Sequence, residues 1–435
     1  MTGVAGGAGH AALEQIVREE AGLVLAALVA SCGDLDLAEE AFQDAVETAL
    51  ERWPRDGVPQ RPAAWLTTAA RRRAIDRLRH GAMRSGKSAA LRASELARLA
   101  AREDEPDPEQ AAVPDERLRL IFTCCHPALA PEARVALTLR TLGGLSTAAV
   151  ARSFLVSEVT MAKRLERAKQ KIRDAQIPYR VPAPDAWAER IRSVLAVVYL
   201  IFNEGYTATG SSDADRRALC AEAIRLAGIL AALLPDEGEV HALSALVLLH
   251  DARSDARVGD DGSLVPLDEQ DRARWRHAEL GAGLAALQRA AHCPGRGPYQ
   301  VQAAIAAAHA TAPSGAETPW RAIAALYAEL EAIHPSPVVR VNRAVAESRA
   351  SGARAGLALL EPLALDARLH ARLAAYQPYH AARADLLRQA GRRDEAREAY
   401  ARAIELCRDE SERRFLERRR AESRANGSSG PARHR

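Results

Sequence analysis

The chain has 435 residues with a formal net charge of +3, and 48% of them are hydrophobic but only 4% aromatic. This length predicts roughly two to four domains, and a composition dominated by Ala, Leu and Arg favours packed helices, so we expect an all-α fold. No apolar run is long enough to span a bilayer, and the N-terminal segment lacks the basic start of a signal peptide. A cytoplasmic protein without a membrane segment is therefore expected.

The first predicted domain covers residues 11–80 and consists of helices. An opening helix over 13–31 reaches a turn at 32–34, and a second helix follows over 35–52. Residues 53–62 contain three prolines and one glycine, which predicts a loop without helix. A basic helix is then expected over residues 65–79.

Charge is unevenly distributed along the chain, although the net charge is small. Residues 71–92 carry eight basic side chains and one acidic, and residues 152–173 carry seven basic and two acidic. Between them, residues 103–116 carry seven acidic side chains and no basic one. This pattern predicts a linker over 81–116, basic and then acidic, and local electrostatic roles for the two basic helices.

A helix-turn-helix is predicted in the second domain, residues 117–178. A scaffold helix begins at Pro131, and Ser146 and Ser157 can each cap one of two further helices. Such a pair places its second helix in a DNA major groove. A basic amphipathic helix can also be merely a solvated surface, but the scaffold helix and the second basic helix at 65–79 favour DNA binding. The apolar stripe expected on the second helix is Val159, Met161 or Ala162, Leu165, Ala168 and Ile172.

Residues 13–179 resemble the extracytoplasmic-function sigma factors of bacterial RNA polymerase. Residues 37–45, followed by Trp53, are similar to the part of region 2 that binds polymerase. Residues 61–79 are similar to the helix that recognises and melts the −10 element, and residues 145–173 to the −35 recognition helices. The extension after residue 186 is similar to the helical array that one subgroup carries. The order and the spacing of these motifs agree with the family.

The resemblance implies three sets of contact residues, in addition to an acidic linker that lies in the RNA path of polymerase. The partners implied are promoter DNA and core RNA polymerase, through its clamp helices and its flap. The −35 element would be contacted by Ser157, Glu158, Thr160, Lys163, Arg164 and Arg167. The −10 element would be contacted by Arg61, Trp65, Arg71, Arg72, Arg73 and Arg77. Core polymerase would be contacted by Leu37, Glu40, Phe42, Gln43 and Asp44.

A third domain over residues 186–420 is predicted to be a helical array resembling tetratricopeptide repeats, with loops at 255–269 and 293–298. Its clearest unit is residues 380–406, where small and large residues alternate as a repeat hairpin requires: Ala384, Leu387, Gly391, Ala396, Tyr400 and Ala403. Residues 421–435 are expected to be a disordered tail. We expect this domain to regulate the first two through a protein or small-ligand partner; a passive solubilising domain is the alternative.

No catalytic constellation is recognisable, so neither an enzyme nor a cofactor or metal site is predicted. Cys124, Cys125 and His126 are adjacent, but adjacent ligands rarely fit one tetrahedral ion, which favours buried thiols. The segment 203–206 allows two interpretations, a small-ligand site or a helix end at Gly205.

The sequence therefore predicts a sigma factor that recruits core polymerase to specific promoters and initiates transcription. Two alternatives remain. A conventional helix-turn-helix regulator with a repeat-built sensor domain would bind duplex DNA without polymerase, and a repeat scaffold with solvated basic helices would not bind polymerase at all. The basic helix at 65–79 favours a sigma factor, because a conventional regulator does not need a second element that recognises separated strands.

Overall fold

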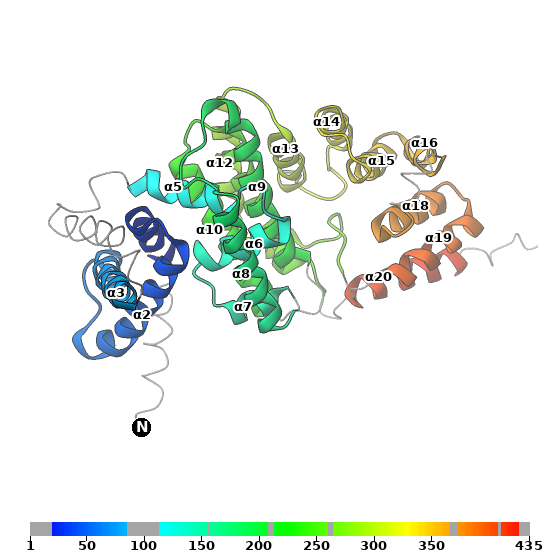
Figure 1. Ribbon diagram of the computed structural model, residues 1–435. Coiled ribbons are helices and arrows are strands. Elements are labelled where there is room, and N and C mark those ends of the chain that lie inside the picture. The colour runs from blue at the N-terminus through cyan, green and yellow to red at the C-terminus, as the bar shows by residue number, and fades with distance from the viewer. Residues whose placement is uncertain are drawn as a thin grey trace, which may run out of the picture. The chain divides into compact units, whose positions relative to one another are not determined.

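The computed structural model describes residues 20–84, 113–154, 156–207, 213–259, 264–365, 373–407 and 410–425. Over these residues the regular structure is α-helix, with two short 3-10 helices and one isolated bridge between Val258 and Leu264. The all-α prediction is confirmed. The chain divides into two compact units, Met1–Ile229 and Leu230–Arg435, which are here called the first unit and the second unit (Figure 1).

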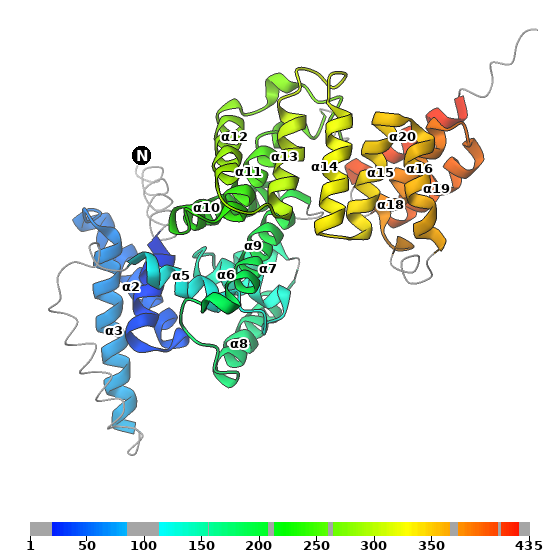
Figure 2. The same cartoon turned by 90° about the horizontal axis from the view of Figure 1, so that it is seen from above.

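In the described part of the first unit, a helical segment over residues 20–32 is followed by α2 (Leu35–Asp56) and α3 (Pro62–Arg84), and α2 and α3 pack side by side (Figure 2). Asp34 caps α2, because its carboxylate accepts hydrogen bonds from the amides of Asp36 and Leu37. The predicted loop at 53–62 is wrong in its first part, since α2 continues through Pro54 to Asp56. A proline near the end of a helix removes only one intrahelical hydrogen bond, and Gly57, at a φ of 85°, ends the helix instead.

The other described helices of the first unit are α5 (Val113–Cys124), α6 (Pro131–Thr141), α7 (Thr147–Ser153), α8 (Glu158–Asp174), α9 (Pro184–Thr207) and most of α10 (Asp213–Leu233). Helix α9 packs on α5 and α6. The Arg190 guanidinium donates a hydrogen bond to the carbonyl of Phe122, 2.5 Å away, and the Ser193 hydroxyl donates to the carbonyl of Cys125 at 2.6 Å. The first two helices after residue 183 are therefore part of the same compact unit as the helix-turn-helix.

The second unit is a series of helices that pack mainly on helices one or two places away in the chain (Figure 2). The 3-10 helices η2 (Ser254–Ala256) and η3 (Arg272–Arg274) lie between the α-helix that ends at Asp251 and the one that begins at His277. The predicted loop at 255–269 therefore begins inside η2, and the predicted loop at 293–298 ends at the first residue of the helix that begins at Pro298. The α-helices are α11 (Gly238–Asp251), α12 (His277–His292), α13 (Pro298–Ala310), α14 (Trp320–Ile333), α15 (Pro337–Ser351), α16 (Ala353–Leu365), α18 (Gln377–Gln389), α19 (Arg393–Leu406) and α20 (Glu410–Ala425).

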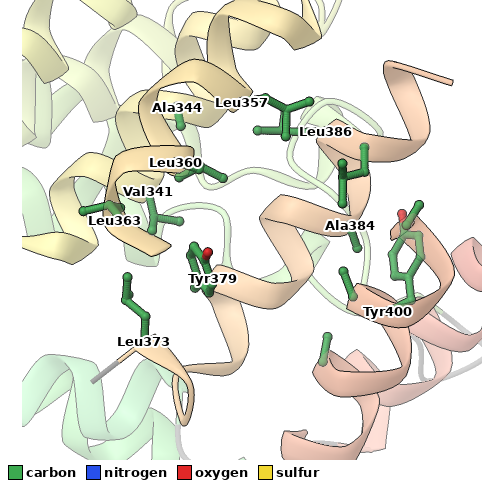
Figure 3. Packing of buried hydrophobic residues seen from close by; sticks show 14 of the residues in the cluster. Val341, Ala344, Leu357, Leu360, Leu363, Leu373, Tyr379, Ala384, Leu386 and Tyr400 are labelled. Carbon is green, nitrogen blue, oxygen red and sulfur yellow. The ribbon is translucent and has the colours of Figure 1, made fainter. Parts of the chain in front are cut away.

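The predicted hairpin at 380–406 is present as α18 and α19. Ala384 and Tyr400 are buried in the core that these helices share with α15 and α16 (Figure 3). Gly391 forms the turn at a φ of 79°, a conformation that costs glycine little. Leu387, Ala396 and Ala403 are also buried, as the spacing predicts.

Element ends differ from the sequence prediction at two further places. Helix α3 extends to Arg84 and α5 begins at Val113, so the segment between described helices is shorter than the predicted linker 81–116. Helix α20 extends to Ala425, so residues 421–425 are helical and not part of a disordered tail. An ion pair between Arg419 and Glu422 at 3.2 Å, three residues apart, supports this last turn. Residues 426–435 lie outside the described part.

Cys124 and Cys125 are buried thiols in and just after α5, as predicted. Burial raises the pKa of Cys125 to about 11 and raises that of Cys124 as well, which keeps both thiols protonated. Within the described residues, no group of three or more His, Cys, Asp or Glu side chains is placed to bind a metal ion. Nor does any helix among them have the length and apolar character needed to cross a bilayer.

Candidate nucleic-acid interface

Helices α6, α7 and α8 form the predicted helix-turn-helix. Ser146 caps α7 by accepting a hydrogen bond from the amide of Ala149 at 3.1 Å, and Ser157 caps α8 by accepting one from the amide of Thr160 at 3.2 Å. Both caps were expected from the sequence, and they set where each helix begins. Helix α8 therefore begins at Glu158, and the side chains at its N-terminal end are exposed to solvent.

The polar face of α8 carries the predicted −35 residues. Ser157, Glu158, Thr160, Lys163 and Arg167 are exposed and Arg164 is half-buried, whereas Met161, Leu165 and Ala168 face the core. The structure thus leaves all six predicted residues at least partly accessible, at the N-cap and in the first three turns of one helix. This face can contact phosphates and base edges in a groove of DNA.

Val159 departs from its predicted place in the apolar stripe, because 65% of its surface is exposed. It occupies the first turn of α8, beside Glu158 and Thr160, where no core partner can reach it. An apolar side chain at the tip of a recognition helix is suited to contact the methyl group of a thymine. Val159 was wrongly included in the apolar stripe, because two residues of an α-helix turn it about 200° from Met161, away from the buried side of α8.

The turn before α7 depends on Gly143. A Cβ there would lie 2.7 Å from the carbonyl oxygen of Leu139 and 2.9 Å from a carboxylate oxygen of Glu222. We expect Gly143→Ala to lower the free energy of unfolding by roughly 1–3 kcal/mol, because the backbone must shift. Gly228→Ala is the matched control, since a Cβ at this helical position meets no atom within 4 Å. Chemical denaturation of both variants measures the difference, and equal stability would contradict this account of the turn.

The predicted −10 residues lie along α3 and just before it. Arg61, Arg72, Arg73 and Arg77 are exposed, and Trp65 and Arg71 are half-buried. The ring of Trp65 packs edge-on against that of buried Trp53, with 5.3 Å between centroids. This contact positions the loop over residues 57–61, in which Val58 is an exposed apolar side chain.

Arg77, a predicted −10 residue, forms ion pairs with two of the predicted polymerase residues. Its guanidinium forms an ion pair with Glu40 at 2.7 Å and a two-pronged one with Asp44 at 2.9–3.0 Å. Glu40 and Asp44 lie on successive turns of α2 and were predicted to contact polymerase. The structure therefore places one predicted −10 residue against two predicted polymerase residues, on neighbouring helices.

The other predicted polymerase residues differ in accessibility. Leu37 and Gln43 are half-buried on α2, but Phe42 is buried in the core of the first unit. In this conformation the side chain of Phe42 packs in the core on the buried side of α2 and is not accessible to a partner. The accessible part of the set is Leu37, Glu40, Gln43 and Asp44.

Comparison with known families agrees with this geometry. Residues 16–83 match the family described as Sigma-70 region 2, and residues 119–172 match Sigma-70, region 4. The first match contains α2 and α3, and the second contains the helix-turn-helix. The chain therefore carries the region 2 and region 4 domains of the sigma-70 family. These two domains support a sigma factor of RNA polymerase, and further helices follow them in the chain.

Residues 190–291 match a family of unknown function, DUF6596, which spans parts of both compact units. The sigma factor is 43% identical over 395 residues to an uncharacterized protein of Rhizobium meliloti (strain 1021), covering 90% of this chain and 91% of that protein. The two proteins therefore belong to one family along almost their whole lengths. No solved structure matches the chain.

Proposed function

We propose that this chain is an extracytoplasmic-function type sigma factor that acts in the cytoplasm, where it recruits core polymerase to promoters with a −35 and a −10 element. The observation that carries the proposal is the pair of exposed basic helix faces, on α8 and on α3, in domains of region 4 and region 2 type. Basic side chains neutralise phosphates and release counterions, which gives affinity that falls as salt rises.

Sequence recognition is assigned to the N-cap and the first three turns of α8. Lys163, Arg164 and Arg167 supply charge, and Ser157, Glu158, Thr160 and Val159 are placed to contact base edges. At the −10 element, Arg71, Arg72 and Arg73 would contact the backbone of an unwound strand, while the 57–61 loop accommodates an unstacked base. Arg61 and Trp65 flank that loop.

The test is transcription in vitro with core polymerase, the full chain and DNA from upstream of its own operon. A sigma factor gives specific transcripts that require core polymerase and the chain together. A conventional regulator would bind the duplex alone and give no transcript with core polymerase, and a passive scaffold would not associate with polymerase. Either of these results would refute the proposal.

We also propose that the helices of the second unit, which resemble tetratricopeptide repeats, regulate the two sigma domains through a protein or small-ligand partner. A stacked array whose helices contact mainly those one or two places away in the chain is suited to binding an extended partner. The hairpin of α18 and α19, with Gly391 in its turn and Tyr400 in its core, supports the likeness to such repeats.

The test of this role is a chain truncated after Asp236. Truncation after Pro184 would remove α9 and the hydrogen bonds that its Arg190 and Ser193 donate to carbonyls in and just after α5. A cut after Asp236 keeps α9 and α10 with the first unit. We expect the truncation to change promoter-specific transcription strongly while the shortened chain stays monodisperse and unfolds cooperatively. Unchanged transcription from a well-folded truncated chain, in every growth condition, would support a passive second unit.

A further inference from the structure

The segment that connects α11 to α12 also contacts two helices much later in the chain. The Asp268 carboxylate forms an ion pair with Arg349 of α15 at 2.7 Å. The carboxylate of the next residue, Glu269, forms one with Arg419 of α20 at 2.9 Å. In a helical-repeat array each repeat contacts only its neighbours, so these two ion pairs depart from the pattern of the array. They hold one turn of the chain against both α15 and α20.

Each of the two arginines is held over an aromatic ring. The guanidinium carbon of Arg349 lies 5.5 Å from the centre of the Trp320 ring. That of Arg419 lies 5.3 Å from the centre of the Phe415 ring, and Arg419 also pairs with Glu422 at 3.2 Å. An aromatic face attracts a guanidinium, and the planar set of donors on the guanidinium matches a carboxylate. Because 42% of the Arg349 side chain and 27% of the Arg419 side chain are exposed, a second molecule can reach both.

The turn that pairs with the two arginines covers them only in part. Residues 264–268 are half-buried and Glu269 is exposed. The Glu269 amide donates to the carbonyl of Pro266 at 2.9 Å, which closes the turn, and the Leu264 amide donates to the carbonyl of Ser411 at 3.3 Å. Ion pairs that remain partly exposed contribute little to stability. A segment that offers the arginines the same carboxylates can therefore replace this turn.

We propose that Arg349 and Arg419 form a site for an acidic segment of a partner protein, and that the turn at residues 264–269 fills this site in the free chain. The feature that the site recognises is a pair of adjacent carboxylates, because each guanidinium forms charge-assisted hydrogen bonds with one of them. A partner with such a pair competes with Asp268 and Glu269 and frees α15 and α20 from the turn. This inference deepens the proposed regulatory role of the second unit and rests on it.

The experiment measures binding of a fluorescein-labelled peptide with the sequence of residues 264–271 to the full chain, by fluorescence anisotropy. The unmodified chain is compared with the double variant Asp268→Asn and Glu269→Gln, whose own turn no longer offers carboxylates to the arginines. An internal competitor acts at an effective concentration in the millimolar range, so we expect the variant to bind the peptide at least about tenfold more tightly. Added salt should weaken this binding, because the contacts are ionic and partly exposed.

Three controls show whether the two arginines form the site. Adding Arg349→Met and Arg419→Met to the double variant should abolish peptide binding, whereas Arg354→Met, at an exposed position of α16, should leave it unchanged. A peptide that carries the same Asn and Gln substitutions should not bind, which tests the carboxylates without further change to the chain.

Three results would overturn the proposal: no binding to the double variant, equal binding to the unmodified chain, or binding that survives the loss of both arginines. The measurement needs neither polymerase nor promoter DNA, so its failure leaves the sigma function intact. A truncated chain with unchanged transcription would refute the regulatory role while peptide binding stays measurable.

Discussion

Replacing Lys163 and Arg167 together by Ala is expected to remove most promoter-specific transcription. Both side chains are exposed on the same face of α8, one turn apart, within the first turns that the Ser157 cap orients. Loss of one phosphate or base contact costs about 1–3 kcal/mol, so two lost contacts lower promoter binding by roughly 30-fold or more. Transcription in vitro from a strong promoter, with the variant and core polymerase, measures the loss.

The matched control is Lys171→Ala, which removes an exposed cation from the same helix. Lys171 lies about 20 Å along the helix axis from Glu158, beyond the turns that enter the groove. We expect it to leave transcription near the level of the unmodified chain. Equal losses from both variants would mean that α8 contributes only general positive charge and that the recognition turns are wrongly assigned.

A related variant tests base recognition separately from charge. Val159→Ser keeps the charge of α8 and removes the apolar surface at its tip. If Val159 contacts a thymine methyl group, a library of −35 sequences should show weaker preference at one position and no change in the salt dependence of binding. A uniform loss over all sequences would contradict a base contact.

Local chemistry made particular elements of both units predictable from the sequence. Ser146 and Ser157 cap α7 and α8 because a hydroxyl just before a helix accepts a hydrogen bond from a free backbone amide of its first turn. This bond does not depend on how the helix packs in the rest of the fold. Gly391 and Tyr400 identified the α18–α19 hairpin for a similar reason. The turn at Gly391 and the burial of the Tyr400 ring both depend on residues that are close in the sequence. Predictions of this kind depend on residues within a few turns of one another.

Features that depend on distant residues were not predictable. The contact between Asp36 and Lys169 joins positions far apart in the sequence, and an isolated acidic or basic side chain does not reveal its partner. Likewise, the spacing of α2 could not show that Phe42 faces the core while Glu40 faces Arg77. The packing of α9 on α5 and α6 was missed because the prolines at 182 and 184, just before α9 and at its first residue, suggest a domain boundary, whereas packing continues across it.

Reversing the charges of Glu40 and Asp44 is expected to abolish association with core polymerase. Like charges facing one another across an interface cost several kcal/mol, so Glu40→Arg with Asp44→Arg should weaken binding by about 100-fold. The structure shows a complication, because both carboxylates pair with Arg77, and the two new arginines would repel it. Loss of binding by this variant alone could therefore reflect a local rearrangement of α3 against α2.

Adding Arg77→Glu resolves the ambiguity, since it restores attraction between the two helices while the outward charge of α2 stays reversed. Exposed ion pairs contribute only about 0–1 kcal/mol, so thermal unfolding of the triple variant should match that of the unmodified chain. We expect the triple variant to remain unable to co-purify with core polymerase, because the partner contacts the carboxylates themselves. Recovery of co-purification would show instead that α2 and α3 need only be correctly packed, and that polymerase binds elsewhere on the first unit.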